Sequence, residues 1–129
     1  MKETTKEWLR AMRYDQETAE ILLEHGRFIY TVFLAVQMVE KAMKALWSET
    51  KEDYPPHTHN LIKLGKLLGV WKKLPLDQRK FLAFISPLYI AIRYPDVHVA
   101  AEDDLDLTEA EDILSQSQEV CQWLEQQMK

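Results

Sequence analysis

Apolar side chains recur every three to four residues along most of the chain, which is the spacing of helices with one buried face. The predicted helices cover residues 5–24, 28–48, 61–69, 77–93 and a last segment that opens at residue 108. The sequence has only three glycines and five prolines, too few turn formers for a many-stranded β fold. The pattern therefore predicts an all-α fold: an up-and-down antiparallel helical bundle of about five helices, forming one domain over residues 1–129.

Turn and cap residues set the expected boundaries of these helices. Asn60 or Thr58 is placed to cap the short third helix. Pro87 predicts a kink in the fourth helix near residues 83–86, and Pro95 ends that helix. The capping box Thr108-Glu109-Ala110-Glu111 predicts the start of the fifth helix.

Charged residues interrupt the apolar pattern in the first two helices. Asp15 lies at the centre of the apolar face of the first helix, where a buried carboxylate needs a partner. The second helix is apolar around most of its circumference, which predicts that several neighbours bury it. Its polar residues form one strip, which consists of Gln37, Glu40, Lys41 and Lys44.

Composition narrows the class of protein. The chain has 129 residues, of which 47% are hydrophobic and 29% charged, as in one ordinary globular domain. Neither a signal peptide nor a membrane span is recognisable, and the lone Cys121 excludes an internal disulfide and a cysteine zinc site. These features predict a cytoplasmic location. The net charge of −5 disfavours a nucleic-acid binder with a broad basic face.

Charge is nevertheless unevenly distributed. Six bases and one acid lie between Leu61 and Lys80, whereas seven carboxylates and no base lie between Glu102 and Asp112. Solvated surfaces explain both runs, and contact of the basic run with phosphates or with an acidic partner is the alternative.

Four stretches in a fixed order carry a family resemblance: WLRAMRYDQETAEILLEHGRF, AVQMVEKAMKALW, HNLIKL and YIAIRYPD. They resemble the HEPN domain family of small helical-bundle proteins from prokaryotes, over nearly the whole chain. The resemblance implies a bundle that pairs as a homodimer. Many members are metal-independent ribonucleases that carry an arginine, four to six residues and a histidine. Others work with a small nucleotidyltransferase in toxin–antitoxin modules, and some are credited with nucleotide binding.

Arg93 and His98 satisfy the spacing of arginine, four residues and histidine. RNA cleavage without a metal needs a base, an acid and a cation on the developing phosphorane charge. Histidine serves either proton role near neutral pH, and arginine matches phosphate oxygens. Because one chain supplies one such histidine, a dimer would complete the site across a two-fold cleft. The neighbouring Tyr94 and Pro95 depart from the pattern of the active ribonucleases.

Helix-end stabilisation is the competing interpretation of Arg93, with Asp96 or the buried Asp15 as its partner. Asp15, Glu40 and Lys44 form either the polar floor of a pocket against Arg93 or a structural ion-pair network.

Histidines and aromatic residues in the loops add weaker candidates. His57 and His59 share a side of an extended loop, but the sequence places no third ligand for zinc, and His59 with Asn60 alternatively orders the third helix. We therefore predict no metal and no cofactor. Tyr54, Trp71, Tyr89 and Tyr94 are the aromatic residues expected near a groove where a base stacks.

Three hypotheses follow from the sequence. The first is a HEPN-type partner of a nucleotidyltransferase that binds a nucleotide or RNA at a groove around Arg93, Tyr94 and Asp96, with Asp15, Glu40 and Lys44 as further ligand-binding candidates. The second is an endoribonuclease that uses Arg93 and His98 across a dimer interface. The third is a bundle without a ligand.

Overall fold

A computed structural model of the protein describes all residues, 1–129, and every regular element in it is a helix. The segments are α1 (Glu3–Glu24), α2 (Phe28–Thr50), α3 (Leu61–Leu67), α4 (Leu76–Ile85), the single turn α5 (Leu88–Ala91), α6 (Pro95–Asp104) and α7 (Leu107–Gln126). The predicted all-α helical bundle is thereby confirmed. None of these helices combines the length and the apolar character that crossing a bilayer requires.

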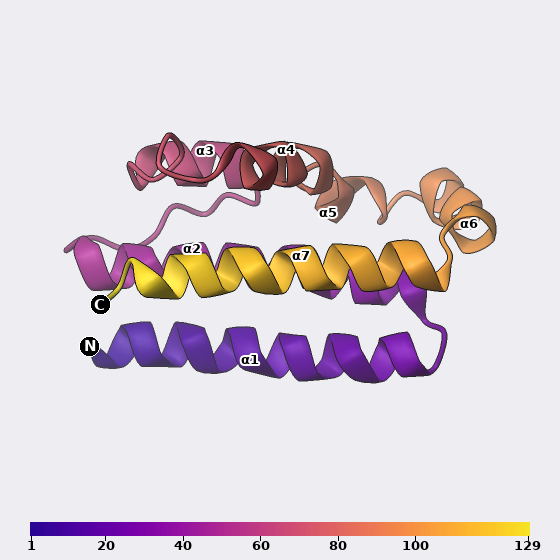
Figure 1. Ribbon diagram of the computed structural model, residues 1–129, viewed down its shortest axis with the longest axis horizontal. Helices are drawn as coiled ribbons and strands as arrows, with labels where there is room; N and C mark the ends of the chain where they lie inside the picture. Colours follow the sequence, from indigo (N-terminus) through magenta and orange to yellow (C-terminus); the bar gives the residue numbers. More distant parts are fainter.

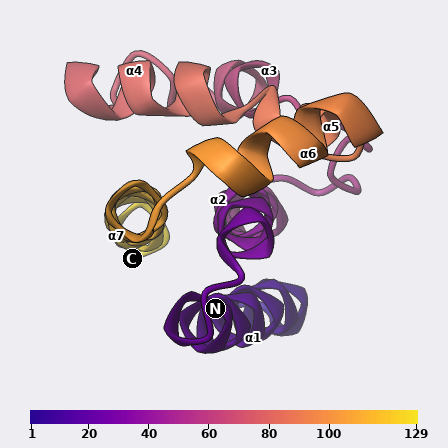
Figure 2. The ribbon, with the colours of Figure 1, turned by 90° about the vertical axis from the view of Figure 1, so that its right-hand side faces the viewer.

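Helices α1, α2, α4 and α7 alternate in direction in this order (Figure 1). Both chain termini therefore lie at the same end of the bundle (Figure 1). Seen along the bundle, α2 is central, with α1 and α7 on two sides and the layer of α3, α4, α5 and α6 above it (Figure 2). The side of α2 opposite α7 has no helix packed on it (Figure 2).

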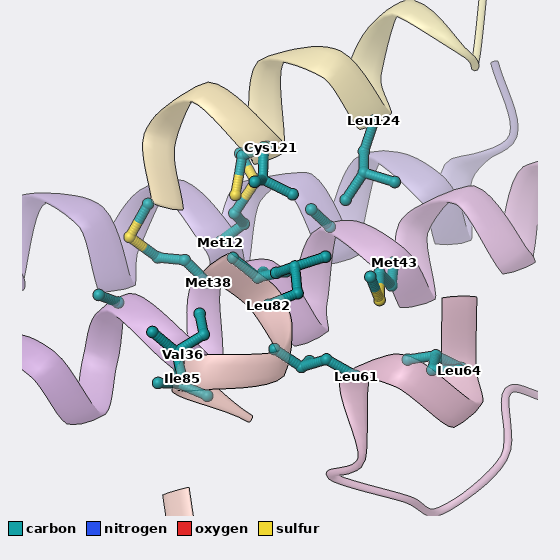
Figure 3. Packing of buried hydrophobic residues seen from close by; sticks show 14 of the residues in the cluster. Met12, Val36, Met38, Met43, Leu61, Leu64, Leu82, Ile85, Cys121 and Leu124 are labelled. Carbon is teal, nitrogen blue, oxygen red and sulfur yellow. The ribbon is translucent and has the colours of Figure 1, made fainter. Parts of the chain in front are cut away.

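The hydrophobic core forms around α2, as its apolar sequence predicts. Of the 23 residues in this helix, 14 are buried. Met38 of α2 lies near Leu82 of α4, and Met43 lies toward α3, which Leu61 opens (Figure 3). From α7, Leu124 enters this cluster (Figure 3). One contiguous core holds the bundle together, because α2 is buried on several sides and α3, α4 and α7 each contribute one apolar face.

Turn chemistry fixes three of the connections. Gly26 adopts φ 73° and allows the chain to reverse between α1 and α2, in a conformation that a side chain disfavours. Asn60 caps α3 by accepting a hydrogen bond from the Lys63 N–H at 3.0 Å, which confirms one of the two predicted caps. The predicted capping box at Thr108 is wrong. Helix α7 begins one residue earlier, and the Asp106 side chain accepts from the Glu109 N–H at 2.8 Å.

The region predicted as one kinked fourth helix contains two separate segments. Helix α4 ends at Ile85 and α5 begins at Leu88, so the break lies next to the predicted kink. Within the break, the Ser86 hydroxyl accepts a hydrogen bond from the Leu61 N–H at 3.0 Å, which ties the break to the start of α3. The chain therefore turns here with this buried N–H paired.

Pro95 marks the start of a further helix, α6, which the sequence pattern does not predict. It occupies the first turn of α6, where its fixed φ fits a helix and its missing N–H costs nothing. Tyr94 precedes it in extended geometry, at φ −82° and ψ 131°. His98 consequently lies on a helix and not in a loop.

Candidate functional site

Arg93 follows α5 and is held by aromatic side chains. Its Nη2 lies 2.7 Å from the Tyr89 hydroxyl oxygen, to which it donates a hydrogen bond. The guanidinium carbon lies 4.5 Å from the centroid of the Tyr89 ring and 5.5 Å from that of Phe33. Both distances are in the range of cation–π attraction. No carboxylate pairs with Arg93, and the residue is exposed. Its charge is therefore oriented but not neutralised.

Tyr89 is the centre of a stack of three rings. Its ring lies 4.8 Å from Phe33 of α2 and 4.3 Å from His59, measured between centroids. Phe33 and His59 stack on Tyr89 and not on each other, so the tyrosine ring lies between them. The residue is only 6% exposed. Packing on both faces fixes the plane of the ring, and with it the position of the hydroxyl that binds Arg93.

Behind His59 lies a buried pair of charges on α2. Glu40 Oε1 lies 2.7 Å from His59 Nδ1, and Glu40 Oε2 lies 3.0 Å from Lys44 Nζ. Both α2 side chains are 9% exposed, whereas the His59 side chain is 46% exposed. Lys44 compensates the buried carboxylate, which would otherwise be costly. The Nε2 atom of His59 makes no hydrogen bond within the protein.

These contacts join six side chains into one connected group, here called the Arg93 cluster: Phe33, Glu40, Lys44, His59, Tyr89 and Arg93. Three of them were predicted as site residues, namely Arg93, Glu40 and Lys44. Glu40 does not contact Arg93 directly. The two are connected by His59, which binds Glu40, and Tyr89, which binds Arg93.

Asp15 lies outside the Arg93 cluster. This carboxylate is buried, as predicted. It forms an ion pair with Lys41 Nζ at 2.7 Å and accepts a hydrogen bond from Gln37 Nε2 at 3.0 Å. Neither Asp15 nor Asp96, the two partners expected for Arg93, forms an ion pair with it. Asp96 is exposed in the first turn of α6, where a negative charge favours the helix dipole. Tyr94 beside it is 59% exposed.

His98 packs against the start of α2. Its ring centroid lies 5.9 Å from that of Tyr30, and its Nδ1 lies 3.4 Å from Glu102 Oε1, one turn further along α6. The histidine also lines a hollow of about 220 Å³, together with Arg27 and other residues of the α1–α2 turn. No hydrogen bond joins His98 to Arg93. The two side chains contact Tyr30 and Phe33, which are neighbours on α2.

Three other features lie apart from the Arg93 cluster. A hollow of about 600 Å³ lies at the end of the bundle where both termini lie, and Trp8 and Tyr54 are among its walls. Burial raises the pKa of the Cys121 thiol, so this cysteine is a core residue and not a thiolate nucleophile. No group of three or more histidine, cysteine or acidic side chains is arranged to hold a metal ion.

Comparison with known proteins identifies the family. The profile of the HEPN domain matches residues 5–127, which is nearly the whole chain. The chain belongs to the HEPN domain family. No curated protein matches it. Among solved structures, it resembles the protein TT1696 from Thermus thermophilus with a TM-score of 0.82 and 26% identity, over 98% of this chain and 99% of that one.

A second solved structure is ST0689, described as an archaeal HEPN homologue. It matches with a TM-score of 0.79 and 24% identity, and both chains are covered completely. At this identity the likeness shows the fold alone, and the fold is that of a HEPN bundle.

Within this HEPN bundle, sequence reasoning missed how three residues assemble. Phe33 was not singled out at all, because a phenylalanine on an apolar helix resembles any other core residue. Tyr89 was expected near a groove, and His59 was assigned to the start of α3 or to zinc. The usable signal was the polar Glu40 on a helix that is otherwise buried, because a buried carboxylate needs a donor and a nearby loop histidine supplies one.

Proposed function

We propose that this HEPN protein binds the phosphate of a nucleotide or of an RNA end at the surface formed by Arg93, Tyr94 and Asp96. The observation that carries the proposal is the state of Arg93. The residue is exposed, its guanidinium is fixed by the Tyr89 hydroxyl at 2.7 Å, and no carboxylate pairs with it. A guanidinium held in this way binds phosphate oxygens through its fork of N–H donors and loses little side-chain entropy on binding.

The residues after Arg93 could bind the base and the ribose of a nucleotide whose phosphate is held by Arg93. Tyr94 is exposed, and its ring offers a face on which a base can stack. Asp96 is exposed one position after Pro95, and its carboxylate can accept hydrogen bonds from ribose hydroxyls. Glu40 and Lys44 support the site from behind through His59 and Tyr89, whereas Asp15 pairs elsewhere and is left out of the ligand site.

A titration with cytidine 3′-monophosphate tests the proposal. Arg93→Gln should weaken binding about tenfold or more, since a charge-assisted contact to phosphate is lost. Tyr94→Ala should weaken binding of the nucleotide but not of inorganic phosphate. Arg10→Gln is the matched control, because Arg10 is exposed on α1 and makes no ion pair. Equal affinities for wild type and Arg93→Gln, measured by calorimetry, would show that the proposal is wrong.

The partner in this proposal is a small nucleotidyltransferase, and the chain itself acts as a homodimer. Family membership supports both. A gene for such a nucleotidyltransferase beside this one, together with co-elution of the two purified proteins, is the expected result. Failure of a co-expressed neighbour to co-elute would remove this part of the proposal.

A metal-independent endoribonuclease is the second candidate, with Arg93 and His98 as the catalytic pair. It is favoured by the contacts of both side chains with the same stretch of α2, at Tyr30 and Phe33. In this case, wild type cleaves RNA in EDTA and leaves 2′,3′-cyclic phosphate and 5′-hydroxyl ends. Both Arg93→Ala and His98→Ala should abolish cleavage. Cleavage that survives either change would exclude this pair.

A further inference from the structure

The contact between Glu40 and His59 has the form of a carboxylate–histidine dyad. The carboxylate is buried and lies 2.7 Å from Nδ1. Such a contact places the imidazole proton on Nδ1 and leaves the lone pair on Nε2. Because the His59 side chain is 46% exposed and its Nε2 has no protein partner, this lone pair is available to a ligand. An imidazole that served only to cap α3 would need neither property, and Asn60 already provides that cap.

The position of the dyad connects it to Arg93. His59 stacks on Tyr89 at 4.3 Å, and the hydroxyl of the same tyrosine binds Arg93 at 2.7 Å. A proton acceptor and a phosphate-binding cation therefore share one buried ring. His98 lacks this arrangement, since its Nδ1 faces the exposed Glu102 and its ring faces Tyr30.

We propose that His59 is the proton-transfer residue of the Arg93 site, and that Glu40 positions it. The inference rests on the proposed binding of phosphate by Arg93. The substrate is an RNA phosphodiester held by the guanidinium. His59 Nε2 takes the proton of the adjacent 2′-hydroxyl, the 2′-oxygen forms a bond to phosphorus, and the bond to the 5′-oxygen breaks. The departing oxygen takes a proton from water, and the imidazolium returns its proton to the solvent.

Lys44 and Tyr89 have supporting roles in this scheme. Lys44 engages Oε2 of Glu40 and leaves Oε1 to His59, so the carboxylate stays in one orientation. Tyr89 fixes the distance between imidazole and guanidinium, because both rest on it. Both act through His59 or Arg93 and are positioning residues.

A binding experiment separates this inference from the function on which it rests. Cytidine 3′-monophosphate is added to protein with ¹⁵N-labelled histidines, and the Nε2 signals are followed at constant pH. We expect the His59 signal to move on binding, and to stay in place in Arg93→Gln. His25 and His57, which lie outside the Arg93 cluster, serve as internal references. If Arg93 binds the nucleotide and His59 does not respond, the inference is wrong and the binding function stands. If nothing binds, both are wrong.

Cleavage of RNA in EDTA tests the proton transfer itself. His59→Ala should lose about 100-fold or more in rate, which is typical for removal of a general base, and added imidazole should restore part of it. His59→Asn retains an amide donor for Glu40 but has no Nε2, so it should fold normally and remain inactive. His57→Ala is the control and should cleave like wild type. No cleavage by wild type, or cleavage that His98→Ala abolishes and His59→Ala retains, would overturn the proposal.

Discussion

At the scale of single residues, Asp15 shows how a charge is accommodated between two apolar helix faces. The residue is 6% exposed, and its carboxylate forms an ion pair with Lys41 and accepts a hydrogen bond from Gln37. Asp15→Asn removes the charge and leaves Lys41 unpaired in a half-buried position. We expect a loss of about 1–2 kcal/mol in the free energy of unfolding, measured by urea denaturation.

A double variant and a surface control complete this test. Combining Asp15→Leu with Lys41→Leu replaces the pair by apolar groups and should recover most of the loss, since a buried ion pair contributes little beyond its own desolvation. Glu17→Gln, an exposed and unpaired position of α1, should be neutral. A neutral Asp15→Asn would show that the contact with Lys41 contributes nothing.

The same scale shows which parts of the site the sequence can predict. A carboxylate on an apolar face indicates that a partner is needed, as at Asp15, and a polar strip on an otherwise apolar helix singles out Glu40 and Lys44. Which donor binds each carboxylate depends on tertiary packing. Glu40 contacts His59, which lies 19 residues further along the chain in a loop. Phe33 of α2 stacks on Tyr89 of α5. The spacing of apolar residues within one helix cannot predict contacts of this kind between separate elements.

At the scale of elements, the start of α7 offers a direct comparison of two candidate caps. The Asp106 side chain accepts from the Glu109 N–H at 2.8 Å, whereas Thr108 lies exposed inside the helix. Asp106→Ala should lower the free energy of unfolding by about 1 kcal/mol, the usual value for a lost N-cap. Thr108→Ala should change it by less than about 0.5 kcal/mol, as surface substitutions generally do. If thermal denaturation instead shows a larger loss of stability for Thr108→Ala than for Asp106→Ala, Thr108 and not Asp106 caps the helix.

Helices differ in how well the sequence defines them. The three long helices were predicted closely, because each repeats its apolar positions over many turns. The boundaries between α4 and α6 were not predicted closely, because Pro95 is compatible both with the end of one helix and with the start of the next. Helix α6 also has no buried residue, so it lacks the apolar stripe by which a helix is recognised.

At the scale of the whole molecule, exposed apolar side chains gather beside Arg93. Ile90 of α5 and Val97 and Val99 of α6 are all exposed within a short span of sequence, and α5 and α6 follow one another toward one end of the bundle (Figure 1). Their burial by a second copy of the chain would explain this exposure and would bring a second Arg93 close to the first. The predicted homodimer therefore has a candidate face.

Sedimentation equilibrium tests this face. Wild type should have twice the 15.2 kDa mass of the chain, and the double variant Ile90→Glu with Val99→Glu should have the mass of one chain. Two carboxylates buried against their own copies in a two-fold interface cost far more than solvent-exposed ones, so dissociation is the expected response. Ile21→Glu is the matched control, because Ile21 is 56% exposed, close to the 52% of Ile90, but lies on α1. A wild type of single-chain mass would contradict the homodimer. A double variant that stays dimeric while Ile21→Glu dissociates would move the interface to α1.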